Sequence, residues 1–409
     1  MRLVIVNHCH PDTPHVCARR AAGFAEALAA QGHRVVLLTE TLAPDDPAPV
    51  MASLMASLDR HDWRTPLLLA TPPEGGGIAR AAREGRLPAG LRQAVLAGLY
   101  LGPGGLFPDW TAGSRRVWPA LAERFRPELV WGIFGNTDAW RIARGLARAA
   151  GCPWVADIKD YWRSFIPAPL RAVLARRFAD AAAMTCLSES NRQDAELWFR
   201  QAKTVIYSGL DQVTPTTPPG PPSQPFRLEL TGGLYDQAAL DTLVAGLSIW
   251  LGTLTAAERE PVVLSYTGTD GRRAAAALRP LQALCRVEVL GYVALERLAA
   301  LQESALANLY IATPRTFHSK VFELFRAGRP ILCCPGDSAE VTALAGRTGA
   351  RLAPCATPAA VCAGLDDAWT RRYDPTPPGG PAALAGFSRD RQTAALAELM
   401  AQVLGGGAP

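Results

Sequence analysis

The chain has 409 residues, which is too long for one ordinary domain and suits two. Hydrophobic residues make up 49% of it and charged residues 19%, as in a globular protein with large cores. The net charge of +5 permits a phosphate-rich ligand or an anionic membrane surface, but it is too small and dispersed to argue for nucleic acid. No apolar run reaches the ~20 residues that span a bilayer.

The first forty residues predict a strand, a helix and a second strand. The opening M-R-L-V-I-V reads as a buried strand, residues 3–6, rather than as a signal peptide. Apolar residues at 21, 24, 25 and 28 mark one helix face, which Gly32 ends, and residues 34–39 form the second strand. This is a β-α-β unit of Rossmann type, but without the G-x-G-x-x-G of a dinucleotide site.

The loop between this strand and this helix is polar and rich in proline. It carries His8, His10 and Asp12, which either face a ligand or are simply solvated. Cys9 and Cys17, with the histidines of the loop, raise the question of a metal site. The spacing C-H-P-D-T-P-H-V-C lacks a second ligand pair, so we predict no metal. The chain has nine cysteines and no C-x-x-C spacing, which predicts reduced thiols and a cytoplasmic protein.

Residues 41–115 have less regular patterning. Proline, glycine and charge interrupt short apolar runs at 67–70 and 94–101. We expect helices and a long loop here. They face an acceptor, touch a membrane or simply pack beneath a loop, and the sequence does not decide among these.

Regular patterning returns after residue 128, with strands predicted at 129–135 and 154–158 and a helix between them. Asp160 follows the second of these strands, where its carboxylate either binds a hydroxyl of a ligand or caps the next helix. Ser188 follows a further strand, residues 182–187, and we favour a helix N-cap for it.

The stretch T-P-T-T-P-P-G-P-P-S-Q-P, residues 214–225, can hold neither a helix nor a strand ladder. We interpret it as a linker between two domains. The predicted division is an N-terminal domain 1–211, a linker 212–225, a C-terminal domain 226–386 and a terminal helix 387–409.

Glycines follow three predicted strands of the C-terminal domain. Gly232 and Gly233 follow the strand 226–230, and Gly268 follows 262–266. Gly291 follows 287–290. Glycine at a strand end lets a diphosphate approach backbone N–H groups closely.

Residues 306–334 predict a strand, a polar loop, a short helix from about Ser319 to Ala327, and a second strand. The helix has Val321, Leu324 and Phe325 on the face toward the sheet. Lys320 and Glu323 share another face of its first turn. Their spacing is compatible with a surface ion pair, and also with a ligand site in which Lys320 binds phosphate and Glu323 binds a ribose.

The segment S-K-V-F-E-L-F-R-A-G-R-P-I-L, from Ser319, resembles the donor-binding segment of glycosyltransferase family 4 and its relatives with the GT-B fold. That fold consists of two Rossmann-like, doubly wound parallel-sheet domains facing a cleft, and the resemblance implies that the terminal helix 387–409 crosses back to the first domain. The resemblance implies that Lys320 lies near the donor phosphates and that Glu323 holds the nucleotide ribose. A second family glutamate, which touches the donor sugar, stands eight positions earlier, where this chain has Arg315.

Further motifs extend the resemblance. G-Y-V at 291–293 is similar to the element whose backbone flanks the nucleotide base. P-W-V-A-D-I-K-D-Y-W at 153–162 is similar to the family pattern P-x-V-x-D-x-R-D-x-W. The predicted donor-binding residues are Gly232, Gly233, Tyr235, Gly268, Tyr292, Val293, Arg315, Ser319, Lys320 and Glu323. The predicted acceptor-side residues are His8, Asp12, Asp160, Trp162 and Ser188.

The resemblance implies transfer of a sugar from a nucleotide-diphosphate sugar to a carbohydrate, lipid-linked or small-molecule acceptor. It implies retention at the anomeric carbon, no metal and no other cofactor. No catalytic group is assigned, and Lys320, Asp160 and His10 are the candidates. A GT-B sugar-nucleotide epimerase and a non-catalytic nucleotide-sugar-binding homologue remain as alternatives, the latter because of Arg315. We expect no nucleic-acid partner, and peripheral contact with the inner membrane face stays open.

Overall fold

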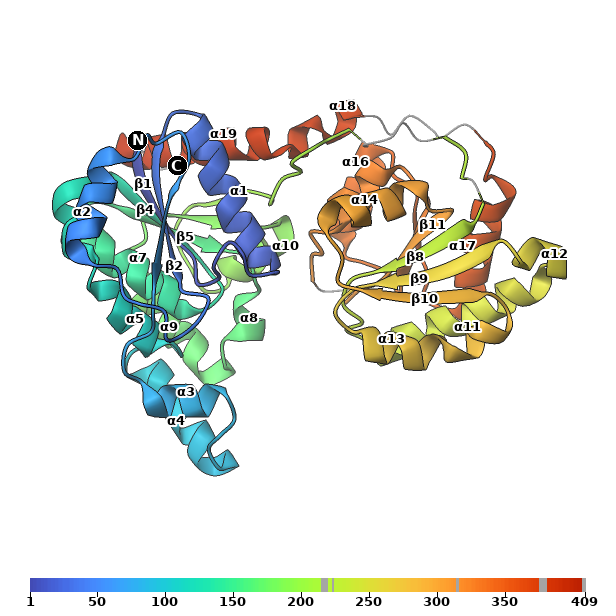
Figure 1. The fold of residues 1–409 in the computed structure, drawn as a ribbon, viewed down its shortest axis with the longest axis horizontal. Helices are drawn as coiled ribbons and strands as arrows, with labels where there is room; N and C mark the ends of the chain where they lie inside the picture. The colour runs from blue at the N-terminus through green and yellow to red at the C-terminus, as the bar shows by residue number, and fades with distance from the viewer. Residues whose placement is uncertain (215–219, 223, 314–315, 375–380, 407–409) are drawn as a thin grey trace. The chain divides into compact units, whose positions relative to one another are not determined.

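The computed structural model describes residues 1–214, 220–222, 224–313, 316–374 and 381–406. The chain forms two compact units, shown in Figure 1. Unit 1 comprises Met1–Ser208 with the last helix, α19 (Arg389–Leu404), and unit 2 comprises Gly209–Ser388. Each unit is a parallel sheet flanked by helices, so the predicted α/β fold class with two Rossmann-like sheets is confirmed. The predicted linker, residues 212–225, lies partly outside the described residues.

Unit 1 is built on a seven-stranded parallel sheet with the order β3-β2-β1-β4-β5-β6-β7. The strands are β1 (Arg2–Val6), β2 (Arg34–Glu40), β3 (Leu67–Thr71), β4 (Leu129–Ile133), β5 (Trp154–Ile158), β6 (Ala183–Cys186) and β7 (Lys203–Val205). Besides α19, the helices are α1 (Val16–Ala30), α2 (Met51–Arg60), α3 (Gly77–Arg83), α4 (Ala89–Leu101), α5 (Pro108–Arg115), α6 (Trp118–Ala120), α7 (Thr137–Ala150), α8 (Trp162–Phe165), α9 (Arg171–Arg177) and α10 (Glu189–Glu196).

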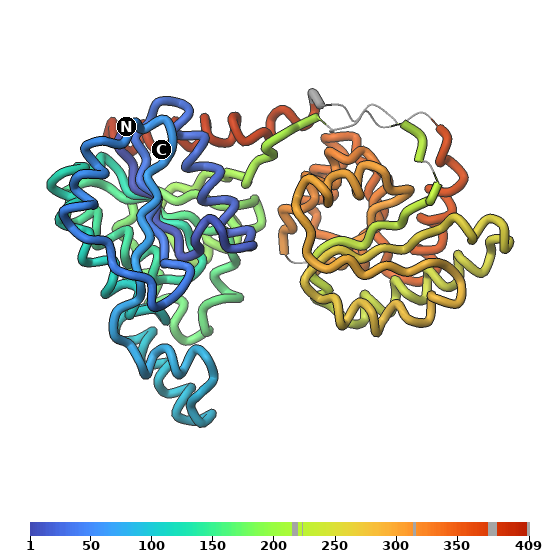
Figure 2. Tube along the Cα trace, in the orientation of Figure 1, coloured from blue at the N-terminus to red at the C-terminus, as the bar shows by residue number. Residues whose placement is uncertain are grey.

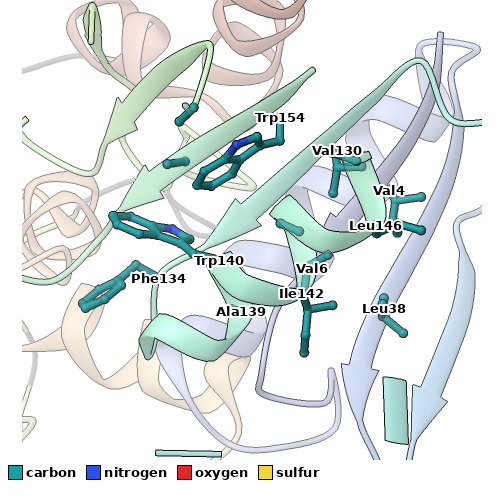
Figure 3. Close-up of a cluster of buried hydrophobic side chains, with 14 of the residues drawn as sticks. Val4, Val6, Leu38, Val130, Phe134, Ala139, Trp140, Ile142, Leu146 and Trp154 are labelled. Carbon is teal, nitrogen blue, oxygen red and sulfur yellow. The ribbon is translucent and has the colours of Figure 1, made fainter. Parts of the chain in front are cut away.

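Both faces of this sheet are buried, as expected for parallel strands covered by helices. On one face, Val4 and Val6 of β1 belong to a cluster with Ile142 and Leu146 of α7, shown in Figure 3. On the other face, the alternate β1 residues pack with α1 and with α19, which contributes Leu396, Leu399 and Met400.

The strand β3 was missed by the sequence prediction, which expected only helices and a loop over residues 41–115. Residues 67–71 pair in parallel with β2, between Pro66 and Pro72. The run is short and lies at the sheet edge, where the local pattern alone does not separate a strand from a helix segment. The predicted helical character is observed in α4, which covers the apolar run 94–101.

An ion pair is buried inside unit 1. Arg20 of α1 donates from Nη2 to Asp157 Oδ1 at 2.7 Å and from Nε to Oδ2 at 3.1 Å. Thr185 also donates to Asp157 Oδ1, at 2.6 Å. Because Arg20 and Asp157 are almost fully enclosed, removing one partner would leave an uncompensated buried charge.

The helices α3 and α4 stand away from the sheet of unit 1, as the chain trace in Figure 2 shows. Helix α4 buries none of its residues, and Leu91 and Leu101 are about half exposed. In the part of the chain that the structure describes, no helix is long and apolar enough to cross a bilayer.

Unit 2 is built on a six-stranded parallel sheet with the order β10-β9-β8-β11-β12-β13. The strands are β8 (Phe226–Thr231), β9 (Val262–Thr267), β10 (Arg286–Gly291), β11 (Ala307–Ile311), β12 (Ile331–Cys334) and β13 (Leu352–Pro354). The helices are α11 (Gln237–Thr253), α12 (Ala256–Arg259), α13 (Gly271–Leu278), α14 (Leu295–Ser304), α15 (Val321–Ala327), α16 (Ala339–Thr348), α17 (Pro358–Thr370) and α18 (Pro381–Leu384). One core cluster joins the sheet to α11 and α17.

The chain order changes direction between β8 and β11, which are adjacent in the sheet although β9 and β10 intervene in sequence. Open α/β sheets bind ligands at such a switch point, outside the carboxyl ends of the strands. In unit 2 that edge carries the loops after β8 and β11.

Candidate functional site

The loops after β8, β9 and β10 are joined backbone to backbone at the carboxyl edge of the unit 2 sheet. Gly232 N–H donates to Thr267 O at 2.9 Å, and Gly268 N–H donates to Gly291 O at 3.0 Å. The Tyr266 hydroxyl donates to Gly232 O, also at 2.9 Å. A Cβ on Gly268 would lie 2.7 Å from Gly232 O, so these loops can approach this closely only with glycine there.

Lys320 lies directly beside this glycine turn. Its Nζ donates to Thr231 O at 3.2 Å and lies 4.9 Å from the ring centroid of Tyr310. Gly232 has φ +93°, and a Cβ there would lie 2.8 Å from Lys320 Nζ. Burial lowers the pKa of Lys320 from 10.5 to about 8, so the ammonium form is held in a site that solvates it poorly.

The helix α15 begins at Val321, slightly later than predicted, and ends at Gly328, whose φ is +67°. Val321, Leu324 and Phe325 are all buried, which confirms the predicted sheet-facing side. The position of Lys320 at the start of this helix therefore follows from an apolar spacing that was readable in the sequence.

Glu323 lies on α15 with its side chain one third exposed, at 33%. Its Oε2 is 3.2 Å from Arg326 Nε, and Arg326 also pairs with Glu303. Arg326 thus keeps a second acidic partner if Glu323 turns toward a ligand. Ser319 is partly buried before the helix, and Arg315 lies outside the described residues.

Sequence reasoning missed a polar network around Asp337. The Tyr310 hydroxyl donates to Asp337 Oδ2 at 2.8 Å, and His318 Nδ1 lies 3.0 Å from the same oxygen. Because the ring of Tyr310 is held by this bond, it presents a fixed face to Lys320. One signal in the sequence could have indicated this network. The run P-G-D-S-A-E after β12 places Asp337 at the end of the strand next to β11.

Tyr235 and the residues after β10 complete the edge. A Cβ on Gly233 would lie 2.6 Å from Tyr235 Cζ, and the Tyr235 ring centroid is 6.2 Å from that of His318. Tyr292 is exposed and Val293 is half-buried, in the loop that adjoins Gly268 through Gly291. The edge therefore offers aromatic and backbone surface around the partly buried amine of Lys320.

In unit 1, the polar loop after β1 packs partly against the protein. His8 Nε2 lies 2.7 Å from Glu40 Oε2, and its ring centroid is 4.2 Å from that of Phe107. Burial lowers the pKa of His8, but hydrogen bonds with Cys9 and Glu40 outweigh it and raise the pKa to about 9. His10 Nδ1 lies 3.6 Å from Oδ2 of the exposed Asp12.

The remaining predicted residues of unit 1 have structural partners. Asp160 pairs with Lys159 and does not cap α8, whose N-cap is Tyr161. Trp162 is fully buried and stacks on Trp140, with ring centroids 5.6 Å apart. Its indole therefore offers no exposed surface to a ligand in this structure.

Ser188 is fully buried at the start of α10, and its Oγ accepts the Asn191 N–H at 3.1 Å. This is the N-cap that the sequence favoured.

The structure thus brings one group of predicted residues together in unit 2: Gly232, Gly233, Tyr235, Gly268 and Lys320. A single ammonium beside glycine backbone suits an anionic group such as a phosphate, because glycines let the anion reach the N–H groups. The predicted residues of unit 1 are distributed between a partly buried loop and the core.

Comparisons with known proteins agree with the fold. No protein-family model matches the chain, and no curated protein matches it. Among solved structures, sucrose-phosphate synthase from Thermosynechococcus elongatus superposes with a TM-score of 0.69 at 13% identity, covering 99% of each chain. Anabaena HepE in complex with UDP and glucose has a TM-score of 0.64 at 13% identity, covering 98% of this chain and 100% of that one.

An epimerase is also similar. The UDP-GlcNAc 2-epimerase from Methanocaldococcus jannaschii superposes with a TM-score of 0.54 at 11% identity, covering 98% of this chain and 99% of that one. At these identities the likeness shows the shared GT-B architecture alone. Membership of glycosyltransferase family 4 stays a prediction.

Proposed function

We propose that the protein is a glycosyltransferase that moves a sugar from a nucleotide-diphosphate sugar to an acceptor. The observation that carries this proposal is Lys320, whose Nζ lies 3.2 Å from Thr231 O beside the Gly232 turn. A partly buried amine at the carboxyl edge of a parallel sheet is suited to a diphosphate. The similarity to a structure containing UDP and glucose supports the same class of donor.

In this proposal the diphosphate lies against Lys320 and the backbone N–H of Gly233, because the Gly232 N–H already donates to Thr267 O. These groups stabilise the negative charge that develops on the leaving diphosphate, and one such donor contributes ~3 kcal/mol to the transition state. Glu323 accepts hydrogen bonds from the ribose hydroxyls, and the backbone at 292–293 flanks the base. The transfer proceeds with retention, without a metal at the diphosphate, and with nucleotide sugar as substrate rather than cofactor.

For the acceptor we propose the loop after β1 in unit 1, where His8, His10 and Asp12 offer polar groups beside the carboxyl edge of the sheet. The acceptor is a glycan, a lipid-linked saccharide or a small molecule. Helix α4, which buries none of its residues, is the element suited to peripheral membrane contact. We propose a cytoplasmic location, at the inner membrane face if the acceptor is lipid-linked.

A sugar-nucleotide epimerase is the second candidate, because an epimerase superposes over 98% of this chain. The two functions differ in what the acceptor does. A transferase needs an acceptor to release nucleotide productively, whereas an epimerase acts on the nucleotide sugar alone.

The test incubates the purified protein with UDP-sugars, with and without a mixture of acceptors, and measures free UDP and the sugar product. Acceptor-dependent release of UDP with a new glycoside supports the proposal. Release without acceptor, with an epimerised sugar, supports the epimerase, and binding without turnover supports the non-catalytic homologue. Lys320→Met removes the proposed donor contact, and Lys203→Met in unit 1 is the matched control.

A further inference from the structure

Three potential metal ligands converge where β1 meets α1 in unit 1. Cys9, His15 and Cys17 each offer one ligand atom, and these three atoms lie within 4.8 Å of one another. Cys9 Sγ is 3.8 Å from His15 Nδ1. Both cysteines are free thiols. None of these three residues has a part in the donor site of unit 2.

The fold positions the three residues independently of a metal. Cys9 lies in the loop after β1, His15 is the N-cap of α1, and Cys17 is in the first turn of that helix. Asn7, at the end of β1, ties the two cysteines together: its Nδ2 donates to Cys9 O at 2.7 Å, and Cys17 Sγ donates to its Oδ1 at 2.9 Å. The loop therefore holds both sulfur atoms on the same side.

We propose that Cys9, His15 and Cys17 bind one Zn²⁺ ion. With Zn–S near 2.3 Å and Zn–N near 2.0 Å, two ligands of a tetrahedral site stand about 3.6 Å apart. The 3.8 Å between Cys9 Sγ and His15 Nδ1 matches that edge closely. Two sulfurs and one imidazole nitrogen form a donor set that selects zinc over magnesium or calcium, which prefer oxygen.

The site has three protein ligands among the described residues, so a tetrahedral zinc would keep one position open. Three protein ligands with a water in the fourth position is the arrangement of catalytic zinc rather than of closed structural zinc. This open position would lie at the carboxyl edge of the unit 1 sheet, where α/β proteins bind ligands.

Zinc binding replaces two hydrogen bonds and brings the ion near one lysine. Both cysteines bind as thiolates and release their protons to solvent, so Cys17 loses the S–H hydrogen bond to Asn7 Oδ1. His15 Nδ1 now accepts the Cys17 N–H at 3.1 Å, and coordination through that nitrogen would replace this hydrogen bond. Lys159 also lies near Cys17, because both residues approach the same point beside Gly135. A Cβ on Gly135 would be 3.5 Å from Cys17 Sγ and 3.9 Å from Lys159 Cε. Its charge is balanced by the adjacent Asp160, with which it pairs.

The sequence prediction of no metal is at odds with this proposal, and metal analysis decides between them. The full chain is expressed in medium with zinc, purified with a phosphine reductant and no chelator, and its zinc measured by plasma mass spectrometry. We expect about one zinc per chain. Cys9→Ser and Cys17→Ser should each lose most of it, while the control Cys362→Ser, a half-buried cysteine of α17, should keep it.

A cobalt-loaded sample gives a readout that does not depend on the variants folding. Replacing zinc by Co²⁺ in the wild-type chain should give intense visible bands of a tetrahedral site and a near-ultraviolet thiolate-to-cobalt charge-transfer band. Circular dichroism checks that the serine variants are folded. The proposal would be overturned by wild-type protein without zinc or by zinc that the double variant Cys9→Ser/Cys17→Ser retains. It would also be overturned by a cobalt spectrum without thiolate bands, or by a Cys9–Cys17 disulfide in the reduced preparation.

Discussion

Replacing Lys320 by methionine should weaken nucleotide binding and stabilise the ligand-free protein at the same time. The side chain keeps a similar length and loses its charge. The amine has a pKa of about 8 instead of 10.5 because burial disfavours its charged form. An ordinary surface lysine would show neither effect, so the combination distinguishes a site built for an anion from a structural contact.

The stability change follows from proton linkage. The fall of the pKa from 10.5 to about 8 means that charged Lys320 costs folding about 3 kcal/mol at pH 7. That cost is fully present below pH 8 and disappears as the pH rises toward 10.5, because the unfolded chain then also loses the proton. Losing the hydrogen bond to Thr231 O subtracts about 1 kcal/mol, which leaves a net gain of about 2 kcal/mol for Lys320→Met.

The binding change has the opposite sign. A charge-assisted hydrogen bond to a diphosphate contributes about 1.5–3 kcal/mol, so the variant should bind UDP roughly 10- to 150-fold more weakly at pH 7. In the wild type, UDP affinity should fall as the pH rises above about 8, where Lys320 loses its proton. The variant should lack this pH dependence.

Isothermal titration calorimetry at pH 7 and pH 9 measures the UDP affinity. Urea unfolding, monitored by hydrogen exchange of unit 2 peptides, measures the stability. Lys203→Met is the control, because Lys203 also donates to backbone carbonyls, at 2.8 Å, but lies in unit 1. Unchanged UDP affinity in Lys320→Met, or a loss of affinity with the same pH dependence as the wild type, would refute the reasoning.

Three further changes test other parts of the structure. Glu323→Gln should raise the Kd for UDP about tenfold and leave the Kd for a 2′,3′-dideoxy analogue unchanged. If titration calorimetry shows that both ligands lose the same affinity, Glu323 does not bind the ribose hydroxyls. Gly232→Ala forces a side chain into φ +93° and should destabilise unit 2 by ~1–2 kcal/mol in urea unfolding, and an unchanged midpoint would contradict the strain. Arg20→Met leaves Asp157 unpaired and should cost ~3–5 kcal/mol in the same assay without changing UDP affinity; a cost below ~1 kcal/mol would contradict a buried charge.

The sequence was sufficient for what depends on local pattern. The apolar spacing of Val321, Leu324 and Phe325 placed α15 and its sheet-facing side. The cap at Ser188 was readable because a serine between a strand and a helix has few other local roles. These features need only interactions between residues that are close in the chain.

The sequence was not sufficient for contacts between distant residues. Tyr310 of β11 and His318 of the loop before α15 meet Asp337, which follows β12, and the strand β3 forms only because β2 offers it an edge. Trp162 matched a motif, but its burial against Trp140 depends on how α7 and α8 pack. By contrast, Cys9, His15 and Cys17 are close in sequence and raised the question of a metal site, but their spacing did not show that the turn into α1 brings their ligand atoms within 4.8 Å of one another.

The most direct test of the central claim is a crystal structure of the protein with UDP. The account predicts diphosphate density within hydrogen-bonding distance of Lys320 Nζ and the Gly233 N–H, with the ribose at Glu323. Clear density for UDP away from Lys320, with that amine still bonded only to Thr231 O, would contradict it.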